Sequence, residues 1–280
     1  PTRIVWSEHG ENISNIEYLL REGNGQADLT NSHICVMKST STVHPSILLD
    51  FGRELHGGVQ IVTGMPADHS PIRVRIRYGE SASEAMCEID GKNGATNDHA
   101  IRDFETTLPW LGTREWGNSG FRFVRIDLLD DNRELHLKEI RAISVMRDVA
   151  YRGTFERNDE RLNQIWQTGA RTVHLNMQEY LWDGIKRDRL VWCGDLHQEI
   201  VTSLYLFGDN KNIPNSLSFL RNETPGDQWI NRIPTYSAWW VINLCDYCQM
   251  TGNMDYFEAN FDYAEAVFNH LNDNVDGSGT

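Results

Sequence analysis

Hydrophobic positions follow two different periods along this chain, and the change falls near residue 150. In the run IRVRIRYGE, which begins at Ile72, apolar residues alternate with arginines, as in a β-strand with one solvated face. The runs SILLDFG, GGVQIVTG and GFRFVRIDLL are of the same kind, and Gly57-Gly58, Gly64 and the stretch from Gly91 to Gly94 predict turns. We therefore predict an antiparallel β-sandwich over residues 33–150, preceded at residues 1–32 by a lead-in segment or the end of a preceding domain.

After Arg152 the apolar positions recur at helical spacing. In the stretch NDERLNQIWQTGARTVHLNMQEYLW they continue to Leu181, with Asn158 or Asp159 as the N-cap and Gly184 as the residue that ends the helix. The same period predicts further helices at residues 195–207, with Asp195 as the cap, and at residues 214–221, 236–250 and 255–271. Their apolar stripes are too wide for isolated surface helices, so these helices must pack on one another.

These two halves predict a multidomain β + α chain in which an antiparallel β-sandwich precedes paired helices at residues 151–280. A closed toroid of paired helices needs many more than the about five helices counted here. We therefore expect a chain that is incomplete at both ends.

The charge balance limits the kinds of partner. Lys and Arg total 26 against 40 Asp and Glu, a formal net charge of −14. This charge argues against nucleic acid or an anionic membrane surface as a partner and favours a neutral or cationic small ligand. No apolar run reaches the roughly 18 residues of a membrane span. The compartment, whether cytoplasmic or periplasmic and secreted, stays open, as does the oligomeric state.

Cysteine and histidine patterns favour neither a disulfide framework nor a metal centre. The five cysteines are odd in number and scattered. The chain has no HExxH grouping. Cys245 and Cys248 form a CxxC pair, but the sequence has no second such pair. We expect no metal and no cofactor.

The stretch WDGIKRDRLVWCGD, from Trp182 to Asp195, carries the densest group of charged and aromatic side chains. We expect it to form a loop between two helices, where a rigid scaffold often presents a site. Three aspartates alternate with three cationic residues, and two tryptophans offer flat apolar faces of the kind that stack on sugar rings. Its charge pattern alone favours a charged, solvated turn without a functional role.

This stretch resembles the signature of bacterial α-L-rhamnosidases of glycoside hydrolase family 78. In that signature an Asp, a following Arg, an acidic residue, a Trp and a Gly-Asp pair line the rhamnose subsite. The phrases LLDFGRELHGGVQIVTG, RIRYGES, GFRFVRI and YRGTFERNDERLNQIW resemble the same family in the same order, so the likeness runs from about Ile47 to the C terminus. The resemblance implies a β-sandwich followed by the N-terminal part of an (α/α)6 barrel, a six-hairpin catalytic domain.

The resemblance also implies a role for each residue of the loop. Ligands of sugar hydroxyls would be Asp183, Arg187 and Asp195. Trp192 would be an apolar wall and Asp188 the proton-donating acid. The family more often has Glu at the acid position, and the shorter Asp reaches the glycosidic oxygen only if the backbone or the substrate lies closer. Glu199, just inside the next predicted helix, is the second candidate for the acid.

Members of the family invert the anomeric centre, which requires two carboxyl groups roughly 6.5–9.5 Å apart. One protonates the leaving oxygen and the other activates water. The resemblance implies a general base beyond Thr280, so this chain would carry the acid side of the site and be inactive, or nearly so, by itself. Glu223 or Asp227 is the alternative second carboxylate within the chain.

The segment DQWINRIPTYSAWW gathers aromatic residues around Pro234. Trp229 and Tyr236 are candidate substrate-binding residues, although aromatic residues at helical spacing equally describe a core. Together these features predict a glycoside hydrolase that releases terminal α-L-rhamnose from small-molecule or oligosaccharide rhamnosides. The alternatives are a non-catalytic carbohydrate-binding protein on the same scaffold, or another (α/α)6 glycosidase or phosphorylase.

Overall fold

The computed structural model describes residues 1–90, 96–98 and 100–276. The turn predicted from Gly91 to Gly94 lies outside the described residues. The chain divides into two compact units, Pro1–Val145 and Met146–Thr280. The division lies close to the position where the period of hydrophobic residues changes. Residues 1–32, expected as a lead-in segment, belong to the first unit, where their first strand pairs with β4.

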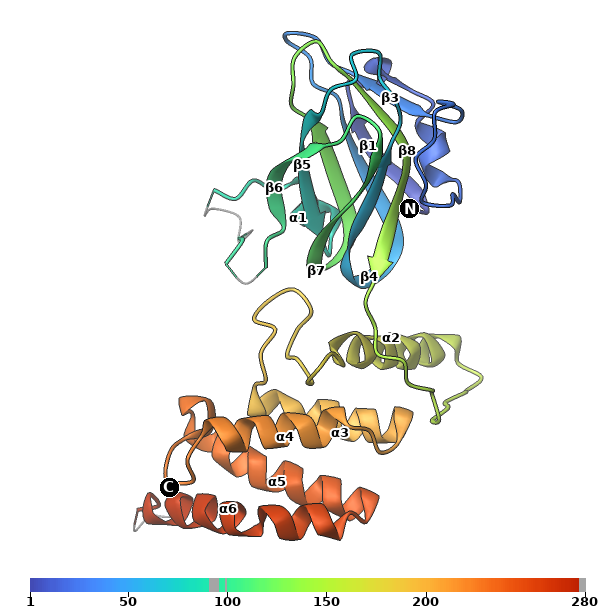
Figure 1. Ribbon diagram of the computed structural model, residues 1–280. Coiled ribbons are helices and arrows are strands. Elements are labelled where there is room, and N and C mark those ends of the chain that lie inside the picture. Colours follow the sequence, from blue (N-terminus) through green and yellow to red (C-terminus); the bar gives the residue numbers. More distant parts are fainter. Residues whose placement is uncertain (91–95, 99, 277–280) are drawn as a thin grey trace. The chain divides into compact units, whose positions relative to one another are not determined.

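The first unit is built on an antiparallel sheet (Figure 1). Among the described residues, eight strands pair in the order β2-β3-β8-β4-β7-β5-β6, with β1 also paired to β4. The strands are β1 (Arg3–Glu8), β2 (Ile13–Ser14), β3 (Cys35–Lys38), β4 (Ser46–Thr63), β5 (Ile72–Gly79), β6 (Asp103–Leu108), β7 (Gly112–Leu128) and β8 (Glu134–Ser144). A short helix, α1 (Ala82–Met86), follows β5. The predicted antiparallel β half followed by helices is confirmed.

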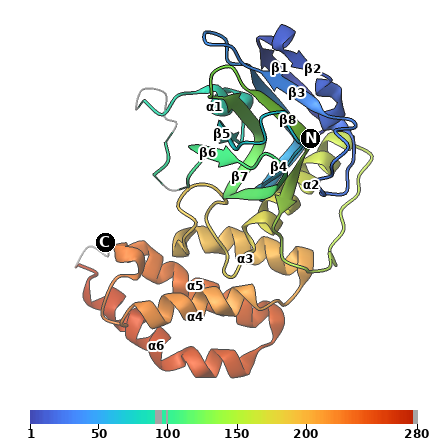
Figure 2. The same ribbon diagram turned by 45° about the horizontal axis from the view of Figure 1, so that its top comes forward.

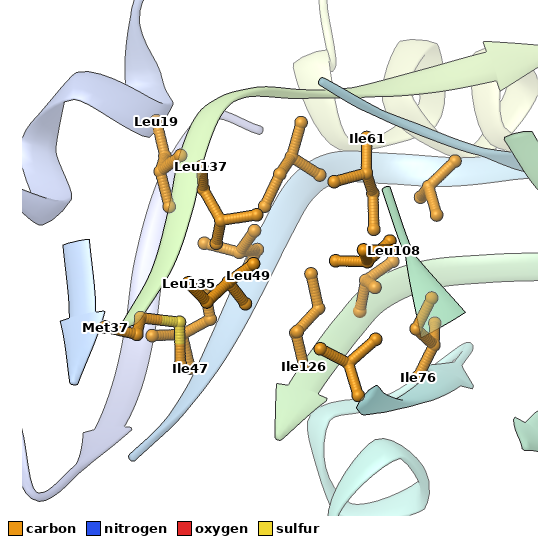
Figure 3. Close-up of a cluster of buried hydrophobic side chains, with 14 of the residues drawn as sticks. Leu19, Met37, Ile47, Leu49, Ile61, Ile76, Leu108, Ile126, Leu135 and Leu137 are labelled. Atoms are coloured by element: carbon orange, nitrogen blue, oxygen red, sulfur yellow. The ribbon is translucent and has the colours of Figure 1, made fainter. Parts of the chain in front are cut away.

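The long strands β4 and β7 pair with each other, and each also pairs with at least one other strand along its length. Residues 46–50 of β4 pair with β1 and β7, and residues 57–63 pair with β7 and β8. Figure 3 shows the resulting core, in which Ile47 and Ile61 of β4 lie among Ile126 of β7 and Leu137 of β8. All four side chains are fully buried. Burial of each such side chain stabilises the fold by about 1.5–3 kcal/mol.

A buried ion cluster lies where β4 bends. Asp50 is 2% exposed. Its carboxylate accepts hydrogen bonds from Arg122 (2.8 and 3.0 Å), from Arg3 (3.0 Å) and from the Gly52 N–H (2.7 Å). The hydrogen bonds from Arg122 are the main reason that the pKa of Asp50 is lowered to about 2. The cluster ties β1 and β7 to β4 at the point where the strand register shifts after Asp50.

The glycine pair at positions 57 and 58 lies inside β4, so the predicted turn there is wrong. A Cβ at Gly57 would overlap the carbonyl oxygen of Ile143, and a Cβ at Gly58 would overlap that of Trp116. Gly57 also has a φ of 138°. The two glycines therefore let neighbouring strands approach closely, and the two runs expected as separate strands form one strand of 18 residues.

The solvated face predicted for β5 is only partly solvated. Arg73 is exposed, but Arg77 is 3% exposed. The Arg77 guanidinium pairs with Asp127 of β7 (2.9 Å) and with Glu88 (2.9 Å). Alternation along the strand located the core face correctly, whereas burial of the opposite face depends on these carboxylates from other segments.

The second unit is helical (Figure 2). Its described residues form α2 (Glu160–Asn176), α3 (Cys193–Phe207), α4 (Asn212–Glu223), α5 (Pro234–Thr251) and α6 (Met254–Asp273). Helix α5 packs against both α3 and α6, and α2 packs against α3. The predicted helices all form, and Asp159 is the N-cap of α2. No helix in the described part of the chain is both long and apolar enough to cross a membrane.

Two predicted helix ends are wrong. Helix α2 ends at Asn176, because Met177 leaves the helical conformation (ψ 84°) and forms a bridge with Leu181. The Leu181 N–H donates to Ser216 Oγ of α4 (2.9 Å). Met177 and Leu181 are fully buried in this turn. Their helical spacing in the sequence therefore reflects the burial of their side chains and not a helical backbone. Helix α3 begins at Cys193, which places Asp195 in the first turn and not at the cap.

We expect Asp50→Asn to lower the free energy of unfolding by about 2 kcal/mol at pH 7, the value of a depression of this size in the pKa of a carboxylate. Because the pKa is lowered in the fold, the contribution is present above the ordinary value of 3.8 and is lost as the pH falls toward 2. Urea unfolding followed by circular dichroism at pH 7 and pH 2.5 measures both effects.

The matched control is Glu105→Gln. Glu105 pairs with Arg73, and both side chains are more than half exposed, so we expect a loss of about 0–0.5 kcal/mol. An equal loss from Asp50→Asn at both pH values would contradict the role given to this ion cluster.

Candidate active site

The loop that joins α2 to α3 is closed by a reciprocal pair of hydrogen bonds. The Asp183 N–H donates to the Leu190 carbonyl oxygen (3.1 Å), and the Leu190 N–H donates to Asp183 Oδ1 (2.9 Å). At its tip, Asp188 and Arg189 both have a left-handed backbone, with φ of 56° and 55°. This conformation is unfavourable for most residues other than glycine, so the closed loop must stabilise it. The loop therefore presents the Asp188 side chain from a defined turn.

Three aspartates of this region act on one another. Burial raises the pKa of Asp183, and the charges of Asp188 and Asp195 raise it further, against the hydrogen bond from Leu190. Asp195 is exposed in the first turn of α3, and the Asp188 side chain is 24% exposed. Arg187 points outward, with its Nε 3.7 Å from Asp188 Oδ1. The structure thus brings together the three aspartates that the sequence singled out, with Arg187 at the edge.

A fourth carboxyl group, that of Glu199, lies on the buried side of α3. Glu199 is 8% exposed. Burial is the main reason that its pKa is raised to about 8, followed by the charges of Asp195 and Asp183, while a hydrogen bond with Asn176 acts in the opposite direction. A carboxyl group with this pKa is mostly protonated at neutral pH.

Two aromatic rings stand beside the carboxyl groups. The ring centroids of Trp192 and Tyr236 are 6.2 Å apart and the planes meet at 81°. Gly194 makes this contact possible, because a Cβ there would overlap the Tyr236 ring. The pKa of Tyr236 is raised by burial and then by charges that include that of Asp195, so its hydroxyl lies within the field of the aspartates. Trp192, directly before α3, and Tyr236 of α5 thus form an aromatic wall next to the carboxyl groups.

Trp229 has a different environment. Its ring centroid lies 4.0 Å from that of His270 on α6. Tyr236 faces the loop, whereas Trp229 packs on α6. The alternative second carboxylates, Glu223 at the end of α4 and Asp227 in the following turn, are exposed.

Asn231, which the sequence did not single out, holds the backbone on both sides of Trp192. Its Oδ1 accepts a hydrogen bond from the Cys193 N–H (3.0 Å), and its Nδ2 donates to the Val191 carbonyl oxygen (3.2 Å). Asn231 has a φ of 50°, a conformation that Asn adopts more readily than most residues. The partners are distant in sequence, and the sequence offers only an Asn in a turn-like segment as a signal.

The arrangement offers carboxyl groups, a phenol, a guanidinium and aromatic faces. These groups can bind the hydroxyls of a polyol, pack on its C–H faces and exchange a proton with it. Within residues 1–90, 96–98 and 100–276, no group of three or more His, Cys, Asp or Glu side chains is arranged to hold a metal ion.

We expect Asn231→Gly to lower the free energy of unfolding by about 1–3 kcal/mol, because the Cys193 N–H and the Val191 carbonyl lose their partner. Glycine keeps the left-handed backbone available, so the change isolates the hydrogen bonds. Urea unfolding followed by tryptophan fluorescence is the measurement. The matched control, Asn132→Gly, removes an exposed Asn that also has a positive φ of 53° and should change stability by less than about 0.5 kcal/mol. Equal effects of the two substitutions would show that the Asn231 amide contributes nothing.

The helical unit resembles a known family of protein domains. Residues 150–273 match the family model of the bacterial α-L-rhamnosidase six-hairpin glycosidase domain. No curated protein matches the chain.

Two solved structures share the fold over most of this chain. A rhamnosidase from Klebsiella oxytoca with rhamnose bound is 19% identical, with a TM-score of 0.73 over 86% of this chain and 51% of its own. A family 78 rhamnosidase of Bacillus sp. GL1 is 20% identical, with a TM-score of 0.75 over 94% of this chain and 27% of its own. The chain therefore spans about half of the first enzyme and about a quarter of the second. The helical unit is thus similar to a bacterial α-L-rhamnosidase six-hairpin glycosidase domain, and the chain shares the fold of two rhamnosidases.

Proposed function

We propose that this chain carries the proton-donating side of a site that hydrolyses terminal α-L-rhamnosides with inversion. The observation that supports it most is the gathering of Asp183, Asp188 and Asp195 beside the aromatic wall, within the residues that match a rhamnosidase domain. The Klebsiella oxytoca relative has rhamnose bound, which favours the same sugar here. The substrate would be a small-molecule or oligosaccharide rhamnoside, and the proposed reaction needs no cofactor.

The roles proposed for the binding residues follow from their chemistry. The carboxylates of Asp183 and Asp195 accept hydrogen bonds from neighbouring sugar hydroxyls, and the exposed guanidinium of Arg187 donates to one. Trp192 and Tyr236 offer apolar faces to the C–H side of the ring and to the methyl group that distinguishes rhamnose from most hexoses. Trp229, which packs on His270, would bind only an extended substrate that reaches α6.

The proton donor must come within hydrogen-bond reach of the glycosidic oxygen. The Asp188 side chain is 24% exposed at the tip of the closed loop, whereas Glu199 is 8% exposed inside the unit. We therefore assign the acid to Asp188 and not to Glu199.

The negative charge of the site suits the reaction. Bond cleavage passes through an oxocarbenium-like transition state, and fixed carboxylates stabilise the positive charge that develops on the sugar. The same crowding keeps protons in the site, since like charges in proximity resist full ionisation. The raised pKa values of Asp183 and Glu199 are consistent with this behaviour.

We further propose that residues 151–280 are part of an (α/α)6 catalytic barrel, that the sheet unit is a β-sandwich, and that the general base lies beyond Thr280. Glu223 or Asp227 is the alternative second carboxylate within the chain. If the full-length protein binds L-rhamnose but hydrolyses no rhamnoside, the alternative of a non-catalytic carbohydrate-binding protein is correct.

In the full-length natural protein, we expect Asp188→Asn to lower kcat about 10²–10⁴-fold on a rhamnoside with a poor leaving group, because that group must be protonated as it departs. The loss should be much smaller on 2,4-dinitrophenyl α-L-rhamnoside, whose leaving group needs no proton. Steady-state kinetics on both substrates gives the ratio.

Asp262→Asn, at an exposed position of α6, is the matched control and should leave both rates unchanged. Full turnover by Asp188→Asn on the poor leaving group would remove Asp188 from the acid role.

A further inference from the structure

The placement of Glu199 differs from that of the other carboxyl groups of the site. It lies one helical turn after Asp195 on α3, yet Asp195 is exposed and Glu199 is 8% exposed. Its carboxyl group forms a hydrogen bond with Asn176 at the end of α2. Its other oxygen, Oε2, is buried and has no hydrogen-bond partner within the part of the chain that the structure describes.

An ionised carboxylate would be poorly stabilised in this position. The charged groups that act on it are Asp195 from the same helix and Asp183 from the closed loop, and both are negative. From helix α2, the neutral amide of Asn176 acts on it. A buried carboxylate whose charged neighbours, among the described residues that act on it, are two like charges takes up a proton in preference to remaining charged.

We infer that Glu199 is a positioning residue of the rhamnoside site: anchored by Asn176 as a neutral carboxylic acid, it supports Asp183 and Asp195 from the buried side without adding a negative charge behind them. The inference rests on the proposed function for the identity of the ligand. Glu199 touches no substrate in this role. Its proton limits the negative charge of the cluster.

The protonation state of Glu199 predicts how sugar binding depends on pH. When Glu199 ionises, near pH 8, a third negative charge appears behind Asp183 and Asp195. The buried charge must then draw in water or push the two aspartates away from it. Either change moves the oxygens that accept hydrogen bonds from the sugar, so binding weakens above this pH.

The first experiment measures the proton without any ligand. Because the pKa of Glu199 is raised in the fold, the folded chain keeps a proton that the unfolded chain loses near pH 4.5, and stability falls with rising pH until about pH 8. We expect Glu199→Gln, which mimics the neutral form, to match the Tm of the wild-type 280-residue chain at pH 4.5 and to exceed it increasingly up to pH 8. Glu265→Gln, at an exposed position of α6, should follow the wild type throughout.

The second experiment measures L-rhamnose binding by calorimetry at pH 6 and pH 9. We expect the wild-type Kd to rise at least fivefold between these values and the Kd of Glu199→Gln to stay constant. Asn176→Ala removes the hydrogen bond that favours the ionised form, so it should shift the alkaline loss of binding to higher pH. This second variant keeps the test available if Glu199→Gln fails to fold.

The outcomes separate the two claims. A Tm difference that does not grow with pH would overturn the proton-holding role. Equal pH dependence of rhamnose binding in the wild type and in Glu199→Gln would overturn the positioning role. If the Tm behaves as expected but neither protein binds rhamnose, the proton-holding role stands and the proposed function fails. Loss of rhamnose binding by a folded Glu199→Gln at pH 6 would make Glu199 a direct ligand and overturn the inference.

Discussion

A carboxylate removed from water needs either a cation or a proton, and the two units meet this constraint in opposite ways. In the sheet unit, Asp50 and Asp127 are both buried, and both lie against arginine side chains. In the helical unit, Glu199 is buried beside the like charges of Asp195 and Asp183, and protonation of Glu199 replaces the cation. The ion pairs of the sheet unit hold neighbouring strands together. Protonation of Glu199 limits the negative charge on the buried side of the proposed site.

The elements with a clear period could be predicted from the sequence, because local spacing reports which face is buried. The core face of β5 and the existence of α2 to α6 followed from spacing alone. The end of α2 did not, since Met177 and Leu181 keep helical spacing but are buried through the bridge between them and a hydrogen bond to Ser216. The same limit applied to Gly57-Gly58, where the reason for glycine lies in neighbouring strands and not in the local sequence.

The candidate site could be located from the sequence because most of its polar groups are contiguous, between Asp183 and Asp195. The contacts that hold the site in place could not be predicted from the sequence. Asn231 reaches back across about 40 residues, and the burial of Glu199 depends on how α3 packs against its neighbours. Left-handed residues occur in both loops, at Asp188-Arg189 and at Asn231-Arg232. In the described part of the helical unit, the non-glycine residues with a positive φ all lie in these two segments, which border the candidate site.

The close fit of Gly194 against the Tyr236 ring has a consequence for how the site comes into being. Asp183 and Asp188 lie in a loop that hydrogen bonds between Asp183 and Leu190 close, so this part of the site can form early in folding. The aromatic wall exists only after α5 has docked beside the start of α3, because Tyr236 lies on α5 and Trp192 directly precedes α3. A partly folded chain would therefore display the acidic groups of the loop without the apolar surface. The combined acidic and aromatic surface of the proposed site is a late product of folding, and it reports that the helices have assembled.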